Sequence, residues 1–565
     1  MSPADITAII PAAGRVPDSV VALSNLTSPA MIPVAGRPVV QWTMSYLISL
    51  GITHFRIAVR ERGLFVEEFV DCVFGADHDV QFVVPGADRG LGFTIHELAS
   101  QVDTAAALAV LGDTHFEFAD PLVLTGTEPV VLVSEVDESY RWCVAEFGED
   151  RRIKGLRDKV PGLTPPLAAL IGVYHFPDVE VLRRAADAVV REVDAAPGGP
   201  GGLVDFTRVL ERVGESTQII VADAAVWLDC GNPDTQASSQ RVLLEQRAFN
   251  QLSVDTTFGT ITKRSTRREK FVDEINYLRM LPDHLSVLFP RVIDFSIDWD
   301  DPFVTMEFYG YPTLAELFVF ENVDAGIWRR VLEHLHHVLQ EGFLSHRRPL
   351  PPGATHEMLL GKALERLDAI HDGSVLSDLL RREGSLNVNG RPLRGVNELT
   401  PILEDEIVAL AASAEGSIIH GDLCFSNILF DLRSGIFKFI DPRGSYGHAG
   451  IYGDPRYDIA KLYHSVYGLY DFITADLFRV HVDGTDAQLD IRTRPYHGEI
   501  RDEFDHLFFT TFDRREILLA TGLIFIGLPA LHYDHPNRQL AFYLRGLQIL
   551  DEALALPRSD QVRGT

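Results

Sequence analysis

Apolar and polar stretches alternate along the first half of the chain as strands and helices alternate in α/β proteins. Strands are predicted at residues 7–10, 55–59 and 80–84. Helices are predicted near residues 39–50 and 65–73. Such alternation indicates a mostly parallel sheet with helices on both faces and a ligand at the carboxyl ends of the strands. We therefore predict a doubly wound α/β domain.

The pattern changes in the second half, where helix predominates after a strand-rich stretch. Strands are predicted near residues 252–263, 292–297 and 303–308, and a helix over residues 268–281. A helical run over residues 234–247 closes the first half, so we place a boundary near residue 248. A chain of 565 residues is too long for one hydrophobic core. We predict two domains, residues 1–247 and 248–565.

The charge balance bears on the class of ligand. With 51 basic and 80 acidic residues, the chain has a net charge of -29. Nucleic-acid binding needs clustered Lys and Arg, so nucleic acid is not an expected partner. An acidic surface would not attract nucleotides from a distance either. A nucleotide site must therefore rely on local lysines, backbone amides and metal ions.

Cysteines and apolar runs bear on the compartment. The four cysteines are Cys72, Cys143, Cys230 and Cys424. They lie far apart and form no C-x-x-C pair, so we expect reduced thiols and neither a zinc site nor a disulfide framework. No basic segment followed by an apolar run opens the sequence, and no stretch approaches the ~18 apolar residues of a membrane span. We expect a cytoplasmic protein with no membrane span.

Residues 419–430 read Ile-His-Gly-Asp-Leu-Cys-Phe-Ser-Asn-Ile-Leu-Phe and have the composition of a phosphoryl-transfer site. Transfer of a γ-phosphoryl group requires a carboxylate beside the acceptor hydroxyl and oxygen ligands for Mg²⁺. Asp422 is the candidate base, and Asn427 is a candidate metal ligand. A hairpin over residues 428–440 would return the chain to Asp441, a second oxygen ligand. The sequence predicts that this base and these two ligands converge.

This spacing resembles the H-x-D-x-x-x-x-N catalytic loop and the metal-binding Asp of the aminoglycoside phosphotransferase and choline kinase family. A single Asp before an apolar run is more often a cap or turn residue, and the joint spacing is what favours the catalytic interpretation. The resemblance covers about residues 250–555. It implies a two-lobed, protein-kinase-like α+β domain that phosphorylates a small hydroxyl compound with ATP and Mg²⁺. The absence of an activation loop ending in Ala-Pro-Glu disfavours a protein kinase.

The same resemblance implies roles for residues before the catalytic loop. Lys263 ends a strand and would contact the ATP phosphates, while Glu274, in the following helix, would hold it. Lys270 is an alternative for this lysine. Residues 305–309, Thr-Met-Glu-Phe-Tyr, resemble the hinge between the lobes, where backbone groups around Glu307 would meet adenine. An edge strand is the alternative interpretation of this segment.

Residues after the catalytic loop would support it and enclose the acceptor. The segment 453–461, Gly-Asp-Pro-Arg-Tyr-Asp-Ile-Ala-Lys, resembles the family's segment in which a helix-borne Asp, here Asp458, braces the loop. His420 is expected to have a similar supporting role. The regions near residues 320–410 and 446–560 are expected to line the acceptor pocket. No pattern in them separates choline from a hexosamine or an amino acid derivative.

In the first half, the strand at residues 7–10 runs into Pro-Ala-Ala-Gly-Arg at residues 11–15. Residues 29–39 then read Pro-Ala-Met-Ile-Pro-Val-Ala-Gly-Arg-Pro-Val. This arrangement resembles the opening of sugar-nucleotide pyrophosphorylases, in which a strand, a loop and a helix hold a nucleoside triphosphate with backbone amides. The resemblance assigns Ala13 and Gly14 to nucleotide binding.

Other matches to the pyrophosphorylases follow in order. Gly92 belongs to a Leu-Gly pair that resembles the base-contacting loop, and Lys159 to an Asp-Lys pair that resembles the one near the sugar phosphate. Asp113 ends a Leu-Gly-Asp segment, and Asp229 lies in residues 227–233, which resemble the second metal-binding segment. Two carboxylates on one Mg²⁺ would suit attack of a substrate phosphate on the α-phosphorus of CTP, UTP or GTP, with pyrophosphate leaving.

The first half departs from the pyrophosphorylase pattern at two places. Gly14 leads into Arg-Val-Pro-Asp rather than into further glycine, and Ala30 stands where the family has lysine. Arg15 is then the candidate cation at the triphosphate, and Lys159 the candidate cation at the acceptor phosphate. A domain that binds a nucleotide or sugar without turning it over is the alternative.

Two functions follow. The first is a bifunctional enzyme that phosphorylates a sugar, amino alcohol or related hydroxyl compound and then transfers an NMP from a second NTP, for surface polysaccharide or other glycan synthesis as the resemblance implies. The second is a small-molecule kinase that carries a catalytically silent binding or oligomerising module. Expected partners are a small-molecule substrate, nucleotides and Mg²⁺, and a homo-oligomer is left open.

Overall fold

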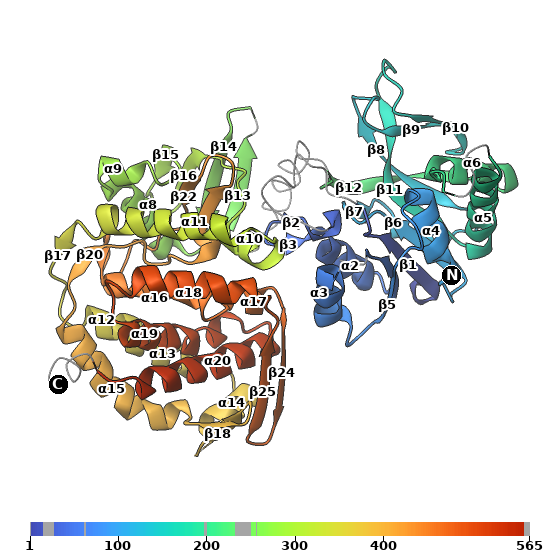
Figure 1. Cartoon of the computed structure of the whole chain (residues 1–565). Helices are drawn as coiled ribbons and strands as arrows, with labels where there is room; N and C mark the ends of the chain where they lie inside the picture. Colours follow the sequence, from blue (N-terminus) through green and yellow to red (C-terminus); the bar gives the residue numbers. More distant parts are fainter. Residues whose placement is uncertain are drawn as a thin grey trace. The chain divides into compact units, whose positions relative to one another are not determined.

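The computed structural model places the chain in two compact units, Met1–Leu243 and Leu244–Thr565 (Figure 1). The structure describes residues 2–14, 28–60, 64–196, 201–231, 250–255, 257–382 and 384–558. The boundary predicted near residue 248 and the helix predicted over residues 234–247 lie outside these ranges. Each unit has its own sheets and its own helices.

The N-terminal unit is built on a ten-stranded sheet in the order β5-β4-β1-β6-β11-β8-β12-β7, with β9 paired to β11 and β10 paired to β9. The strands are β1 (Ile6–Pro11), β4 (His54–Ala58), β5 (Asp79–Val83), β6 (Ala106–Val110), β7 (Thr114–Phe118), β8 (Val130–Val136), β9 (Cys143–Phe147), β10 (Ile153–Asp158), β11 (Leu167–Phe176) and β12 (Ile220–Asp229). The pairs β5-β4, β4-β1, β1-β6 and β8-β12 are parallel, whereas β11 and β7 run antiparallel to their neighbours. The predicted α/β unit with a mostly parallel sheet is confirmed, and its antiparallel strands were not predicted.

Helices cover both faces of this sheet (Figure 1). They are α2 (Val39–Ser49), α3 (Leu64–Phe74), α4 (Leu91–Ser100), α5 (Val179–Ala195) and α6 (Phe206–Ser216). Ile9 of β1 and Ala107 of β6 belong to one apolar core with residues of α4, α5 and α6. The alternate residues Ala8 and Leu108 are also fully buried. Because successive side chains of a strand point to opposite faces, both faces of β1 and β6 are covered.

The register of β7 brings two acidic residues together at one edge of the sheet. After β6 the chain turns over residues 111–113 and enters β7, whose first residue, Thr114, pairs with Asp229 at the end of β12. The backbone N–H of Cys230 donates to the carbonyl of Asp113 at 2.9 Å. Asp113 therefore lies beside Asp229, although β6 and β12 are not neighbours in the sheet.

The C-terminal unit begins with a four-stranded antiparallel sheet in the order β13-β14-β16-β15. Its strands are β13 (Asn250–Asp255), β14 (Thr260–Ser265), β15 (Val292–Ser296) and β16 (Phe303–Glu307), with helix α8 (Arg268–Met280) between β14 and β15 in the chain. Phe271 and Ile275 of α8 pack with Val304 of β16. They are four residues apart and therefore share one face of the helix. The strands and the helix predicted for this region are confirmed.

The remainder of this unit is rich in helix and contains small sheets. The helices are α9 (Asp283–Ser286), α10 (Leu314–Phe320), α11 (Ala325–His337), α12 (Ala354–His356), α13 (Lys362–Asp368), α14 (Val375–Arg381), α15 (Val396–Ala412), α16 (Pro455–Val466), α17 (Tyr470–Thr474), α18 (Tyr496–Phe508), α19 (Arg514–Ile526) and α20 (Pro536–Ala555). The small sheets contain β17 (Arg347–Arg348), β18 (Leu386–Val388), β19 (Arg391–Leu393), β20 (Gly416–Ile418), β21 (Ile428–Asp431), β22 (Ile436–Phe439), β23 (Tyr452–Gly453), β24 (Phe478–Asp483) and β25 (Asp486–Ile491). β21 and β22 form the hairpin that was predicted over residues 428–440. Within the described ranges, no helix is long and apolar enough to cross a membrane.

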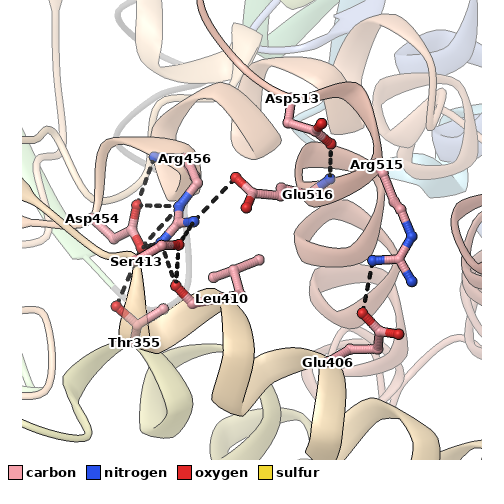
Figure 2. Close-up of polar contacts among 9 residues, drawn as sticks. All are labelled: Thr355, Glu406, Leu410, Ser413, Asp454, Arg456, Asp513, Arg515 and Glu516. Atoms are coloured by element: carbon pink, nitrogen blue, oxygen red, sulfur yellow. Dashed lines mark hydrogen bonds and ion pairs between the residues drawn. The ribbon is translucent and has the colours of Figure 1, made fainter. Parts of the chain in front are cut away.

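A buried arginine fixes the start of α16 (Figure 2). The Arg456 guanidinium donates to both carboxylate oxygens of Asp454 at 2.7–3.2 Å and to Glu516 Oε2 at 3.1 Å. It also donates to Ser413 Oγ at 3.1 Å and to the carbonyl of Leu410 at 2.9 Å. These bonds join the end of α15 and the first turn of α19 to the first turn of α16. The orientation of α16 is therefore determined by contacts with two other helices.

Candidate active sites

Lys263 of β14 joins Glu274 of α8 to Asp441, which follows the β21–β22 hairpin. Its Nζ is 2.7 and 3.0 Å from the two carboxylate oxygens of Glu274 and 2.8 Å from Asp441 Oδ1. Burial disfavours the positive charge, but the carboxylates of Asp441 and Glu274 outweigh burial and raise the pKa of Lys263. The ammonium group is therefore charged at neutral pH. The predicted pairing of Lys263 with Glu274 is present in the structure.

Asp458 of α16 holds the backbone of the loop that precedes the hairpin. Its carboxylate accepts the N–H of His420 at 2.6 Å and the N–H of Gly421 at 2.8 Å. Gly421 has a φ of 78°, and a Cβ at this position would lie 2.8 Å from Cβ of Arg443. Glycine is therefore needed both for the backbone conformation and for the close approach. The structure contains the brace predicted for Asp458.

His420 connects the same loop to the returning strand of the hairpin. Its ring stacks on Phe289, with centroids 5.9 Å apart. Burial lowers the pKa of His420 to about 4, so the ring is neutral at neutral pH. Nε2 lies 3.0 Å from the carbonyl of Ile440, and Nδ1 lies 3.3 Å from the backbone nitrogen of Asp422. A neutral ring that donates from Nε2 and accepts at Nδ1 satisfies both contacts.

Asp422 forms an ion pair with a lysine to which no role was assigned from the sequence. Its Oδ1 lies 2.8 Å from Nζ of Lys461. Burial disfavours the carboxylate, but the positive charges of Lys461 and Arg443 outweigh burial and hold the pKa of Asp422 well below its usual range. Lys461 lies three residues after Asp458 on α16, so both side chains reach the loop from one face of the helix. That spacing was the available sequence signal.

Asn427 lies between the loop and the hairpin. Its side-chain Nδ2 donates to the backbone carbonyl of Asp422 at 2.9 Å, and its backbone carbonyl accepts the N–H of Ile440 at 3.0 Å. The amide oxygen of Asn427 and the carboxylate of Asp441 are hard donors, which Mg²⁺ takes in small number together with water and phosphate. No group of three or more His, Cys, Asp or Glu side chains in the described part of the chain is placed to bind a metal. A metal at this site would therefore depend on these two oxygens and on the phosphates of a substrate.

Glu307 ends β16 in the segment that was compared with a hinge. Its backbone N–H donates to the carbonyl of Arg291 at 3.1 Å, and the N–H of Phe308 donates to the carbonyl of Gly259 at 2.9 Å. The Glu307 side chain accepts the hydroxyl of Tyr309 at 2.9 Å. The backbone N–H groups of Glu307 and Phe308 are thus both bonded to backbone carbonyls of nearby residues. An adenine contact in this segment would therefore use other backbone groups.

A cavity of about 170 Å³ lies beside Asp422 and Asn427. Its walls include side chains from residues 358–366, which run into α13, and from residues 523–531, which span the end of α19 and the turn after it. Tyr457 and Lys461 of α16 and Tyr470 of α17 add to the lining. Both wall segments fall in the regions that were expected to enclose the acceptor.

In the N-terminal unit, Asp113 and Asp229 lie together at the end of the sheet. Oδ2 of Asp113 is so near Gly231 that a Cβ there would lie 2.3 Å from it, and Oδ1 of Asp229 accepts the N–H of Gly231 at 3.1 Å. Burial, and then the negative charge of Asp229, raise the pKa of Asp113 to about 6. Two adjacent carboxylates are suitable ligands for Mg²⁺, and without a cation their negative charges repel each other.

The loop after β1 is contacted by an arginine that follows the neighbouring strand, β4. Arg60, two residues after β4, donates from Nε to the carbonyl of Ala13, and its guanidinium lies 3.6 Å from Asp88. Gly14 is the last described residue of this loop, and Arg15, the predicted cation, lies outside the described ranges. No role was predicted for Arg60 from the sequence. Its position after a parallel strand was the signal, because the carboxyl ends of such strands form the ligand edge.

Ala30 is fully buried next to the loop that carries Asp113. A Cβ at Gly112 would lie 3.4 Å from the Ala30 methyl group. The hydroxyl of Ser28 fixes this segment by donating to the carbonyl of Ala12 at 2.7 Å. Ala30 therefore presents a methyl group one residue away from Asp113, at the position where the pyrophosphorylase resemblance implies a lysine.

Gly92 and Lys159 are two further residues to which the pyrophosphorylase resemblance assigns a role. Gly92 lies in the first turn of α4, and its N–H donates to the carbonyl of Val204 at 3.0 Å. A Cβ at Gly92 would be 2.8 Å from that carbonyl oxygen, so close packing requires glycine here. Lys159 is exposed just after β10, with a φ of 51°. The base contact assigned to Gly92 and the contact with the acceptor phosphate assigned to Lys159 stay predictions.

Comparison with known proteins finds similarity among solved structures, whereas no protein-family profile and no curated protein matches the chain. A protein from Bacillus anthracis assigned as a glucose-1-phosphate thymidylyltransferase, crystallised with sucrose, is 19% identical over 43% of this chain and 97% of its own, with a TM-score of 0.36. HddC from Yersinia pseudotuberculosis is 15% identical over 42% of this chain and 99% of its own, with a TM-score of 0.34. The same protein complexed with GMP-PN is 14% identical over 42% and 99% of the two chains, with a TM-score of 0.32. These structures are similar to the N-terminal part of the chain.

Proposed function

We propose that the C-terminal unit is an ATP-dependent kinase of a small hydroxyl compound and that the N-terminal unit is a nucleotidyltransferase acting on the phosphate so formed. The observation that carries the proposal is the ion-paired cluster of Lys263, Glu274 and Asp441 next to the loop that bears Asp422. These residues come from a strand, a helix and two loops that are distant in sequence. Lys263 thus holds a buried positive charge between two carboxylates, while Asp422 and Asn427 line the cavity.

In the kinase step, Asp422 accepts the proton of the acceptor hydroxyl. The acceptor oxygen then bonds to the γ-phosphorus of ATP as the bond from that phosphorus to the β,γ-bridging oxygen breaks, and ADP leaves. Lys263 neutralises phosphate charge, and Glu274 keeps its ammonium group in place. When bound by Asn427 and Asp441, Mg²⁺ supplies further neutralisation of the phosphates. The low pKa of Asp422 means that its carboxylate is ionised before the hydroxyl arrives.

In the transferase step, the phosphate of the kinase product attacks the α-phosphorus of CTP, UTP or GTP, and pyrophosphate leaves. Asp113 and Asp229 would hold Mg²⁺ at this step, which would relieve the repulsion between their carboxylates. Arg60 donates to the carbonyl of Ala13 and so helps to order the loop whose backbone amides, at Ala13 and Gly14, are assigned to the triphosphate. The product would be a nucleotide-linked unit of the kind that glycan assembly consumes.

The kinase step is tested with the purified full chain, MgATP and a panel of sugars, amino alcohols and hydroxy acids, by measuring ADP release. Asp422→Asn should lower kcat at least about 100-fold with the best acceptor, because the proton acceptor is lost. Asp431→Asn, in the turn of the adjoining hairpin, is the matched control and should retain activity within about twofold. Acceptor-dependent ADP release that survives Asp422→Asn would overturn the assignment.

A catalytically silent N-terminal unit is the second candidate, favoured by the methyl group of Ala30 beside Asp113. The two candidates differ in pyrophosphate release from an NTP in the presence of the kinase product. Release that depends on Asp113 supports the transferase. Failure of CTP, UTP and GTP to yield pyrophosphate, with the kinase step intact, supports the silent module.

A further inference from the structure

The cavity beside Asp422 is lined by four cationic side chains. Lys362 and Arg366 come from α13, Arg443 from the segment after the hairpin, and Lys461 from α16. Asp422 is the one carboxylate in the lining. Much of the remaining surface is apolar, with contributions from Met358, Leu359, Leu523, Ile524, Leu528 and Leu531. This concentration of positive charge stands against a net charge of -29 for the whole chain.

Two of the four cations have partners that account for their charge. Lys461 forms the ion pair with Asp422. Arg443 donates to the hydroxyl of Tyr457 at 3.0 Å and lies near the negative charges of Asp422 and Asp458. These contacts tie both cations to the catalytic loop, where they set the ionisation of the candidate base.

Lys362 and Arg366 differ from the other two cations. The nearest polar contact of Lys362 Nζ is the neutral sulfur of Met358, at 3.3 Å. The guanidinium of Arg366 packs against Gly527, where a Cβ would lie 3.4 Å from Nη1. Among the described residues, no carboxylate forms an ion pair with either side chain. Glu357 acts on Lys362, and Asp422 and Glu365 act on Arg366, only through longer-range charge interactions.

The pKa shifts of Lys362 and Arg366 show that each side chain lies close to other positive charges. Burial, and then the positive charges of Arg443, Arg366 and Lys270, lower the pKa of Lys362 to about 8. Burial also lowers the pKa of Arg366; Arg443 adds to this effect, whereas Tyr457, Asp422 and Glu365 oppose it. Cations that disfavour one another in a partly buried space are stabilised when an anion binds between them.

We propose that the acceptor of the kinase step is an anionic hydroxyl compound whose phosphate or carboxylate group is bound by Lys362 and Arg366 while its hydroxyl faces Asp422. This inference rests on the proposed kinase function. The ATP phosphates have their own cation in Lys263, on a different element, so Lys362 and Arg366 are not needed for them. Of the acceptors that the sequence left open, choline is excluded by charge, because its quaternary ammonium would lie among like charges.

The anion also fits the chemistry of transfer. The acceptor oxygen forms a bond to the γ-phosphorus, its proton moves to Asp422, and the bond to the β,γ-bridging oxygen breaks to release ADP. The product carries the transferred phosphate as a second anionic group, which remains close to the cationic side chains of the cavity. With glycerate the product would be a phosphoglycerate, and with a sugar phosphate it would be a bisphosphate.

The test uses the nucleotide-free full chain and three probes that differ mainly in charge: glycerol 3-phosphate, glycerate and glycerol. Isothermal titration calorimetry should show at least one anionic probe binding at least tenfold more tightly than glycerol. Lys362→Met combined with Arg366→Met should weaken that binding at least tenfold, and Lys362→Arg combined with Arg366→Lys should largely restore it. Arg381→Met combined with Arg382→Met, which removes the same charge from the exposed end of α14, should change it less than twofold.

Results that would contradict the anionic acceptor differ from results that would contradict the kinase. Glycerol binding as tightly as the anions, no binding of either anion, or equal binding by the Lys362→Met/Arg366→Met variant would each overturn the anionic acceptor. If that variant does not fold, as judged by circular dichroism, Lys362→Met alone is measured and should weaken binding at least threefold. ADP release with a neutral or cationic acceptor would refute this inference while leaving the kinase intact. Anion binding at Lys362 and Arg366 without ADP release from any acceptor would refute the kinase instead.

Discussion

Nζ of Lys461 lies 2.8 Å from Oδ1 of Asp422, and the helix that carries Lys461 also holds the backbone of the Asp422 loop through Asp458. The pairing keeps the Asp422 carboxylate ionised in a buried setting. Helix α16 therefore both positions the candidate base and sets its protonation state. Arg456 fixes the start of this helix through bonds to Glu516 of α19 and Leu410 of α15. The position of α16, and with it that of Asp422, therefore depends on how α15 and α19 pack.

Replacing Lys461 by Met should raise the pKa of Asp422, because the nearest positive charge is removed while burial remains. The acid limb of the pH profile of kcat should move upward by at least about one pH unit. Lys461→Arg keeps the charge and should return the profile toward that of the natural protein. An acid limb that stays in place in Lys461→Met would show that Lys461 does not control this ionisation.

Replacing Lys263 by Met should lower kcat/KM for ATP at least about 100-fold, because the phosphates lose their lysine and Glu274 is left buried without its partner. Arg264→Met is the matched control. Arg264 is the next residue on β14, so it points to the opposite face, where it pairs with Asp301. Steady-state ADP release at varied ATP measures both variants, and equal losses in the two would contradict the role of Lys263.

The two aspartates of the N-terminal unit predict a pH-dependent response to Mg²⁺. The pKa of Asp113 is raised from 3.8 to about 6, so its contribution to stability is fully present below pH 3.8 and is lost as the pH rises through about 6. The shift corresponds to about 3 kcal/mol of repulsion and desolvation at neutral pH. Mg²⁺ should therefore raise the melting temperature of this unit at pH 7 and raise it less than half as much at pH 5, where protons compete.

The matched variants for this response are Asp113→Asn and Asp187→Asn. Asp113→Asn removes one carboxylate of the pair and should abolish the effect of Mg²⁺ at both pH values. Asp187 lies on α5, where it pairs with Arg191, and its replacement should leave the effect unchanged. Differential scanning fluorimetry measures all three proteins, and an equal shift in Asp113→Asn would place the ion elsewhere.

Replacing Arg456 by Met should destabilise the C-terminal unit by about 3–5 kcal/mol, because Asp454 and Glu516 are left without their buried partner. Arg382→Met, an exposed change at the end of α14, should alter the free energy of unfolding by no more than about 0.5 kcal/mol. Urea unfolding followed by circular dichroism compares the two variants. A loss below about 1 kcal/mol in Arg456→Met would mean that the network does not fix α16.

The parts of the site that were predictable from the sequence are those that short-range structure brings together. Asp422, Asn427 and Asp441 lie on one loop and one hairpin, so their spacing alone indicates convergence. Lys362 and Arg366 come from a separate helix, and their orientation depends on how α13 packs, which periodicity does not encode. Alternation likewise predicted the parallel strands of the N-terminal unit. It could not give the direction of β7 and β11, because apolar patterns do not distinguish parallel from antiparallel neighbours in a buried sheet.

The coupling of the two units is tested most directly by ³¹P nuclear magnetic resonance of the full chain incubated with Mg²⁺, ATP, a second NTP and the best acceptor. We expect a phosphorylated acceptor followed by its nucleotide-linked diphosphate, with no new product from Asp422→Asn and only the phosphorylated acceptor from Asp113→Asn. A nucleotide-linked product that persists in Asp113→Asn, or a natural protein that stops at the phosphorylated acceptor with CTP, UTP and GTP alike, would contradict it.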